Sequence, residues 1–259
     1  MSNNRVAVIT GGAQGIGRKT AELFAQRGYH LAIIDLRSPD GTVRAIEATG
    51  GQVLAFAGDI TDEATVNRFA AQVFSRYARV DVLVNNAGIS HICPAELTAS
   101  SDYRRVLEVN LVAPFLLAKV FAEKMLQAGS GSIVNVASVA GLLGVSDRAA
   151  YNASKHGLIG LTRTLAAEWG GRGVRVNAVC PGWVKTEMDA ADQARGTYTD
   201  ADIESRVPMA RFASPEDIAR AIAFLADSDE SPFINGHALS VDGGWATDGS
   251  WESLRLSKR

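Results

Sequence analysis

A tyrosine and a lysine four residues apart are the side chains of this sequence best suited to proton transfer. Tyr151 and Lys155 begin a helical pattern, and their spacing puts them on one helical face. A free tyrosine, with a pKa of about 10, is a poor base near neutrality, but a nearby ammonium lowers that pKa. The pair therefore predicts a tyrosine that exchanges a proton with an alcohol or carbonyl oxygen. The plainer alternative is two surface neighbours.

A serine in reach of the same chemistry lies 13 residues before the tyrosine. Ser138 follows an apolar run and precedes the helical pattern of Tyr151. Strand ends and helix starts meet at the carboxyl edge of a parallel sheet, where ligands bind. Ser138 is therefore predicted to hydrogen-bond the same substrate oxygen, the alternative being an ordinary cap or turn residue.

A glycine-rich turn follows the first apolar run and leads into a helix. Glycines at such a turn permit positive φ and a close approach of the backbone to a pyrophosphate, which the helix N-terminus attracts. The spacing is not the commoner G-x-G-x-x-G, and a plain strand-to-helix turn is the alternative. The residues of the turn predicted to hold a dinucleotide are Gly11, Gln14, Gly15, Ile16 and Gly17.

Acidic residues end the second and third predicted strands. Asp35 lies 18 residues past Gly17, close to the spacing at which a carboxylate accepts from an adenosine ribose hydroxyl. That carboxylate would repel a 2′-phosphate, so NAD is favoured over NADP, and Arg37 is interpreted as solvated rather than turned towards such a phosphate. Asp59, followed by Ile60, is predicted either to bond the adenine or to cap a helix.

The fourth predicted strand ends in two asparagines and two small residues. Small residues and amides at this place line a cofactor crevice or form a turn equally well. The members of this group predicted at the cofactor are Asn86, Ala87 and Gly88.

Short strand-like runs alternate with longer helical patterns, which predicts right-handed βαβ units and a parallel sheet. Several runs are almost wholly apolar, as expected for strands covered on both faces. Pro114 lies inside a helical pattern and predicts a kink or break there. The strands are predicted at 5–10, 30–36, 52–57, 81–85, 131–136, 173–179 and 238–241, and the helices near 15–28, 62–77, 100–128, 149–170 and 214–226.

The bulk composition is that of an ordinary globular protein. The chain has 259 residues and a formal charge of −2, which gives no reason to expect nucleic acid or a membrane as partner. Its two cysteines and four histidines make no metal-ligand spacing, so neither a metal site nor a disulfide is predicted. We expect a cytoplasmic protein whose residues 1–259 form a single domain.

Taken together, these motifs resemble the short-chain dehydrogenase/reductase family in its compact branch of about 250 residues. The resemblance runs from Val6 to Gly244 and rests on many motifs in the right order. They are Thr10-Gly11-x3-Gly15-x-Gly17, Asp59, Asn85-Asn86-Ala87-Gly88, Asn110, Ser138, Tyr151-x3-Lys155, Pro181-Gly182 and Val241-Asp242-Gly243-Gly244.

The resemblance implies a Rossmann-type, doubly wound sheet of seven parallel strands and hydride transfer between nicotinamide and a carbinol or carbonyl carbon. It implies that Tyr151 is the general acid/base, that Lys155 lowers its pKa and holds the nicotinamide ribose, and that Ser138 polarises the substrate oxygen. Asn110, from the residues alone an amide in a helical segment, would hold a water of a proton relay. The family pattern adds Pro181, Gly182, Val184 and Thr186 to the cofactor site and implies a homotetramer built on the helices at 100–128 and 149–170, with a second contact through the C-terminal end.

The irregular stretch 183–213, with one short helix expected near 200–206, is expected to be a substrate lid or a disordered excursion. The tail 245–259 is expected to close over a neighbouring subunit or to fray. The substrate pocket is predicted to involve His91, Leu142, Trp183 and Met188, a mixed surface without a basic cluster. A small uncharged secondary alcohol, polyol or sugar is therefore favoured. The alternatives are an NADPH-dependent 3-oxoacyl thioester reductase, which Asp35 opposes, and a non-catalytic nucleotide sensor.

Overall fold

Seven parallel strands form one sheet in the computed structural model, which describes residues 5–196, 198–251 and 253–254. The order β3-β2-β1-β4-β5-β6-β7 reverses direction between β1 and β4, as in a doubly wound sheet. The strands are β1 (Val6–Thr10), β2 (His30–Asp35), β3 (Val53–Ala57), β4 (Val82–Asn85), β5 (Gly131–Val136), β6 (Val174–Pro181) and β7 (Ala238–Val241). The predicted fold class and all seven predicted strands are confirmed, to within two residues at each end.

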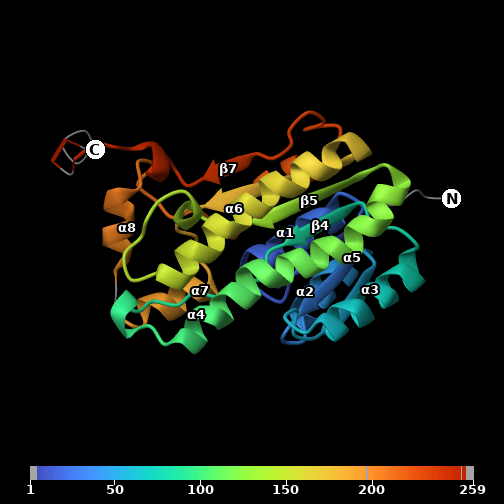
Figure 1. Ribbon diagram of the computed structural model, residues 1–259, viewed down its shortest axis with the longest axis horizontal. Helices are drawn as coiled ribbons and strands as arrows, with labels where there is room; N and C mark the ends of the chain where they lie inside the picture. Colours follow the sequence, from blue (N-terminus) through green and yellow to red (C-terminus); the bar gives the residue numbers. More distant parts are fainter. Residues whose placement is uncertain (1–4, 197, 252, 255–259) are drawn as a thin grey trace.

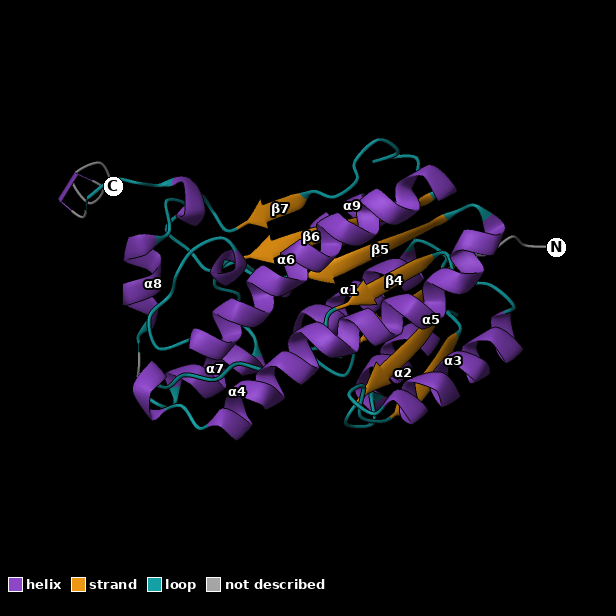
Figure 2. Ribbon diagram, in the orientation of Figure 1, coloured by secondary structure: helices purple, strands orange, loops and turns teal. Residues whose placement is uncertain are grey.

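Helices cover both faces of the sheet (Figure 1). One layer contains α1 (Gly15–Gln26), α2 (Asp40–Glu47) and α9 (Pro215–Ala226), and the other contains α3 (Glu63–Tyr77), α5 (Ala113–Ala128) and α6 (Ala149–Trp169). Beyond the carboxyl ends of the strands lie α4 (Ser100–Leu107), α7 (Glu187–Gln193) and α8 (Asp200–Arg206) (Figure 2). The long helices therefore cover the two faces, and the carboxyl edge of the sheet is bordered by loops and short helices.

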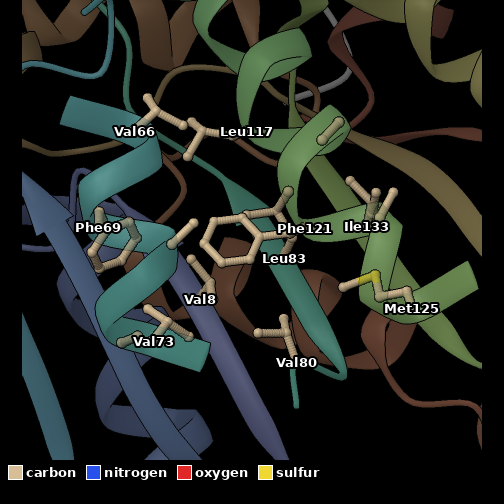
Figure 3. Close-up of a cluster of buried hydrophobic side chains, with 14 of the residues drawn as sticks. Val8, Val66, Phe69, Val73, Val80, Leu83, Leu117, Phe121, Met125 and Ile133 are labelled. Atoms are coloured by element: carbon tan, nitrogen blue, oxygen red, sulfur yellow. The ribbon is translucent and has the colours of Figure 1, made fainter. Parts of the chain in front are cut away.

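Alternating side chains of each central strand belong to two different cores. In β1, Val8 packs with α3 and α5, whereas Ile9 packs with α1 and α9 on the opposite face. The first core is filled by the rings of Phe69 and Phe121, which meet edge to face at 6.0 Å between ring centroids (Figure 3). Because both faces are covered, β1 is buried throughout, which explains its continuous apolar run.

The predicted helix 100–128 is interrupted, as Pro114 led us to expect. The segment consists of α4, a π-helical turn at Glu108–Val112 and then α5, in which Pro114 is at the start. Proline has no N–H, so it removes the donor that the carbonyl of Asn110 would receive in a regular α-helix. The interruption therefore falls on a residue that the family pattern singles out.

Two short helices were not predicted. Helix α2 has only eight residues, of which Thr42 and Ile46 are buried, too few for a recognisable helical period. Helix α7 lies in the stretch that was expected to be irregular, where Thr186 accepts a hydrogen bond from the N–H of Asp189 and caps the helix. The short helix expected near 200–206 is α8.

Within the part of the chain that the structure describes, no helix is both long and apolar enough to span a membrane.

Candidate active site

A cavity of about 390 Å³ lies at the carboxyl ends of the strands, over the point where the strand order reverses. Its walls come from the turn after β1, from the ends of β2, β4, β5 and β6, and from α6 and α7. This is the position at which doubly wound sheets bind their ligands. All of the predicted cofactor residues line the cavity except Gly17, which is buried beneath it.

The glycine turn has the shape that a pyrophosphate requires. Gly11 and Gly15 have φ values of +65° and +54°, a region in which side chains are strained. A Cβ on Gly17 would lie 2.1 Å from the carbonyl oxygen of Gly11, so only glycine allows this contact. Because α1 begins at Gly15, its free N–H groups face the cavity. These residues therefore fit a dinucleotide.

Asp35 and Arg37 meet at the adenosine end of this cavity. The carboxylate of Asp35 accepts from the backbone N–H of Ala13 at 3.0 Å and from that of Arg37 at 3.0 Å, so its position is fixed. The Arg37 guanidinium is exposed, as expected, and it donates to the side-chain oxygen of Gln14. Both an acceptor for ribose hydroxyls and a cation thus lie where the adenosine ribose would bind.

Asp59 is not the cap of the following helix, because Asp62 caps α3 instead. The Asp59 carboxylate accepts from the Thr61 hydroxyl at 2.8 Å and pairs with Arg105 of α4 at 3.1 Å. Burial raises the pKa of Asp59, but its hydrogen bonds and Arg105 outweigh burial and hold the pKa below its usual range. Asp59 therefore stays ionised beside Ile60 at the adenine end.

Asn86 and Thr10 fix the chain between the first and fourth strands. The Asn86 amide donates to the carbonyl oxygens of Thr10 and Gly11 at 2.9 and 3.0 Å. In return, the Thr10 hydroxyl accepts from the N–H groups of Asn86 and Ala87, both at 3.0 Å. These bonds hold the glycine turn against the end of β4, with Gly88 following on the cavity wall.

Ser138 and Tyr151 are brought together from two elements. Ser138 follows β5 and caps the 3-10 turn Val139–Gly141, accepting from the N–H of Ala140 at 3.1 Å, while Tyr151 lies in the first turn of α6. Burial raises the pKa of Tyr151, and a hydrogen bond with Ser138 partly offsets that rise. The two hydroxyls therefore share one place at the end of the cavity.

Lys155 is buried one turn beyond Tyr151. Its Nζ donates to the carbonyl oxygen of Val136 at 2.8 Å and lies 5.6 Å from the centre of the Tyr151 ring. Burial lowers the pKa of Lys155 to about 8. The expected lowering of the Tyr151 pKa is not observed. Burial dominates and raises that pKa, because removal of the phenol from water disfavours its anion.

Asn110 lies behind the catalytic pair and does not line the cavity. Its side-chain oxygen accepts from the N–H of Ile89 at 2.9 Å, and its amide nitrogen donates to the Ile89 carbonyl at 2.9 Å and to the Ser154 hydroxyl at 3.1 Å. Both amide hydrogens are therefore used for structure. The group of Asn110 suited to a water is its main-chain carbonyl, which Pro114 deprives of its regular helical donor.

The segment after β6 closes the cavity. A Cβ on Gly182 would lie 2.9 Å from the Cα of Asp242, so glycine is required for this approach. Val184 makes an isolated parallel bridge with Ala213, which ties the start of the predicted lid to its end. Pro181 and Thr186 also line the cavity.

The predicted substrate residues separate into two groups. Trp183 and Met188 line the cavity, whereas His91 and Leu142 do not, and Leu142 packs instead against a small core that includes Ile159 and Cys180. Trp183 stacks on Trp245 at 4.1 Å between ring centroids. The beginning of the tail therefore packs on the protein's own lid; residues 252 and 255–259 lie outside the described part.

A group of charged and hydroxylated side chains at the catalytic end was missed. Sequence patterns gave no signal for it, because its members come from the start of α6 and from the lid. They are Arg148, Asp189, Asp192 and Tyr198, and all four line the cavity. The cavity is accordingly more polar at this end than was predicted.

Comparison with known proteins gives consistent matches over nearly the whole chain. A family model described as enoyl-(acyl carrier protein) reductase matches residues 11–246. D-threitol dehydrogenase from Mycolicibacterium smegmatis is 41% identical over 94% of this chain and 93% of its own. A 3-oxoacyl-[acyl-carrier-protein] reductase from Thermotoga maritima is 39% identical over 93% of this chain and 97% of its own.

Solved structures share the same architecture. One from Beutenbergia cavernae, assigned provisionally as an NAD(P)-dependent gluconate 5-dehydrogenase with NADP at low occupancy, is 42% identical with a TM-score of 0.86. The match covers 94% of this chain and 97% of that structure's chain. Levodione reductase gives a TM-score of 0.90 at 33% identity, with 93% and 97% of the two chains covered.

Proposed function

Since this chain belongs to the short-chain dehydrogenase/reductase family and is an NAD(P)-dependent oxidoreductase, we propose that it is an NAD-dependent dehydrogenase of a small polyol or sugar-like secondary alcohol. The observation that carries this proposal is the meeting of Ser138, Tyr151 and Lys155 at one end of a cavity whose other end fits a dinucleotide. When bound, the nicotinamide accepts or supplies the hydride.

Tyr151 serves as the general acid/base of this reaction. Because burial keeps its pKa above the ordinary value, the free enzyme holds the phenol protonated at neutral pH, ready to donate to a carbonyl oxygen. Ser138 holds the same oxygen through its hydroxyl and polarises it. For alcohol oxidation the proton moves the other way, from the substrate hydroxyl to the Tyr151 oxygen, so oxidation gains from rising pH.

Lys155 and Asn110 support the proton transfer. With a pKa of about 8, the Lys155 amine exchanges protons near working pH and holds the nicotinamide ribose through its remaining N–H groups. The main-chain carbonyl of Asn110 holds a water that links Lys155 to solvent. The backbone is assigned this role because the amide side chain is already bonded to Ile89 and Ser154.

NAD is the proposed cofactor because of the charge at Asp35. Its carboxylate is held by two backbone N–H groups and retains lone pairs for the ribose hydroxyls, while it repels a 2′-phosphate. Arg37 is the residue that opposes this preference. Its bond to Gln14 keeps the guanidinium near the ribose, where its positive charge would attract the 2′-phosphate of NADP and partly offset the repulsion by Asp35.

A polyol or sugar is favoured over an acyl thioester on the character of the cavity. The catalytic end carries acidic side chains, Asp189 and Asp192, which suit hydroxyl donors. The similarity to D-threitol dehydrogenase also supports this class. The similarity to a 3-oxoacyl-[acyl-carrier-protein] reductase supports the alternative of a thioester reductase. Activity on a 3-oxoacyl thioester is therefore measured together with activity on a polyol.

The experiment is turnover of a tetritol and of a 3-oxoacyl thioester with NAD(H) and NADP(H), followed by absorbance of the reduced nicotinamide. Tyr151→Phe should lower kcat at least about 100-fold while NADH still binds, as seen by fluorescence. In the wild type, kcat/KM for oxidation should rise with pH. Unchanged turnover in the variant, or a flat pH profile with chemistry rate-limiting, would refute the role of Tyr151.

A homotetramer is the proposed assembly. Apolar side chains are exposed on the helices that the family uses for contact, with Val112 at 37% and Phe115 at 44%, and Phe233 is fully exposed before β7. Such side chains on a solvent-facing surface favour burial between subunits. Sedimentation velocity measures the mass, and a monomer at micromolar concentration would refute the assembly.

A further inference from the structure

The catalytic end of the cavity contains an ion pair that the chemistry at Tyr151 does not require. Arg148, the residue before α6, pairs with Asp192 of α7 at 3.3 Å and also donates to the Ser90 hydroxyl at 2.8 Å. The side chains are only 13% and 11% exposed. Both line the cavity. A pair of this kind is costly to bury, and replacement by apolar residues would often be neutral or stabilising.

A second carboxylate lies one helical turn from this pair. Asp189 and Asp192 are three residues apart on α7 and therefore share its inner face. Tyr198 donates to the Asp189 carboxylate at 2.8 Å, and Lys185 lies 3.5 Å from its other oxygen. Two carboxylates and one guanidinium are thus held in place at one end of the cavity.

These groups line the same cavity as Tyr151. Arg148 precedes Tyr151 by three residues, and after burial and Ser138 the charges of Arg148 and Asp192 are the next influences on the Tyr151 pKa, in opposite directions. A substrate carbon held at Tyr151 therefore places its neighbouring substituents beside this pair.

We propose that Arg148, Asp192 and Asp189 form a subsite that binds the non-reacting hydroxyl groups of a neutral polyhydroxylated substrate. The carboxylates accept from those hydroxyls, and the Arg148 guanidinium donates to them, so each hydroxyl can both give and receive a hydrogen bond. This inference rests on the proposed oxidoreductase function and names the substrate class of that site.

The charges at the subsite favour a neutral substrate over an acid. Asp192 already neutralises Arg148. Asp189 is paired with Lys185, so neither cation is left unpaired for a substrate carboxylate. A substrate carboxylate would have to displace Asp192 from Arg148 and would still face Asp189. A neutral hydroxyl needs no such exchange, because it can bond to these groups from the cavity side while Arg148 and Asp192 stay paired.

The test compares three four-carbon substrates: a tetritol, 2-butanol and 3-hydroxybutyrate. The wild type should have a kcat/KM for the tetritol at least about tenfold above that for either of the others. Asp192→Asn, which keeps the shape but removes the charge, should lower tetritol kcat/KM by about 10- to 100-fold, as expected for a charge-assisted hydrogen bond. It should leave 2-butanol within about threefold.

The matched control is Asp147→Asn. Asp147 is exposed, lies next to Arg148 and has a φ of +58°, a region that asparagine tolerates. The Asp147→Asn variant removes the same charge outside the cavity, and it should change kcat/KM for neither the tetritol nor 2-butanol. Because Asp192 also acts on Tyr151, the pH profile with 2-butanol is recorded for each variant, so that a shifted profile is separated from lost contact.

A second variant keeps the test valid if Asp192→Asn does not fold. Arg148→Met/Asp192→Leu removes both charges together and leaves neither partner unpaired. With NADH binding intact, it should show the same selective loss on the tetritol. Equal losses on the tetritol and 2-butanol, unchanged tetritol turnover, or preference for 3-hydroxybutyrate would each overturn the subsite while the oxidoreductase function stands. Absence of turnover for every alcohol and ketone with both cofactors would overturn both.

Discussion

Replacement of Lys155 by methionine should make the folded protein more stable at neutral pH, although the variant loses activity. The Lys155 side chain is 3% exposed, and its burial lowers its pKa from 10.5 to about 8. Below pH 8 the lysine is protonated in both the folded and the unfolded chain, so the folded protein carries the whole cost of a buried ammonium.

The size of this cost follows from the pKa shift. At 1.36 kcal/mol per unit, the shift from 10.5 to about 8 amounts to about 3 kcal/mol. Methionine has similar length and no charge, but it cannot donate to the Val136 carbonyl, a loss of about 1 kcal/mol. Lys155→Met should therefore raise the free energy of unfolding by about 2 kcal/mol at pH 7.

The sign of the pH dependence is fixed by which state releases its proton first. Between pH 8 and 10.5 the folded chain loses the Lys155 proton while the unfolded chain keeps it, so wild-type stability rises with pH in this window. The advantage of the variant should shrink across the window and reverse before its upper end, because the wild type regains about 3 kcal/mol against a net advantage of about 2 kcal/mol. Titrating groups that do not interact with Lys155 are common to both proteins and cancel in the difference.

The assay is urea unfolding of wild type and variant from pH 6 to 10.5 at fixed protein concentration, with NADH absent. Lys124→Met is the matched control, because Lys124 is exposed on α5, where it donates to the Gln127 side chain at 3.1 Å. Its stability difference should be within about 0.5 kcal/mol and independent of pH. A Lys155→Met variant that is less stable at every pH, or whose difference does not vary with pH, would refute the reasoning.

Two further predictions concern the ends of the cavity. Asp35→Ala should raise kcat/KM with NADP relative to NAD by about tenfold or more, because the repelling carboxylate is gone and Arg37 remains; a wild type that already prefers NADP would contradict this role. Trp245→Ala removes the stack on Trp183 and should raise KM for the alcohol about 3- to 10-fold without weakening NADH binding; an equal loss of NADH affinity would show that the stack supports the whole cavity.

The sheet was predictable because its residues carry local signals. Runs such as Leu31–Ile34 are apolar throughout, since strands of a doubly wound sheet are covered on both faces. The break at Pro114 was also predictable, because the missing N–H acts within one helical turn. Helix α2 was not, because only Thr42 and Ile46 of its eight residues are buried and no period results.

The cofactor end of the site was predictable for a similar reason. Its residues end a strand or follow one directly, so the parallel sheet alone brings Gly11, Asp35 and Asn86 to one edge. The sign of the pKa change at Tyr151 was not predictable, because the spacing to Lys155 gives a charge but not the burial that outweighs it.

The substrate end depends on distances that no local pattern encodes. Arg148 and Asp192 are 44 residues apart, and Asp192 reaches the cavity only because Thr186 starts a helix in the lid. Once α7 forms, the pair joins the lid to the helix that carries Tyr151, so a substrate that binds between them also holds the lid over the reacting carbon. Substrate choice and lid closure thus depend on the same charges. It follows that Asp192→Asn should lower turnover least for a simple alcohol. 2-Butanol has no hydroxyl beyond the reacting one, so it cannot couple substrate binding to closure of the lid.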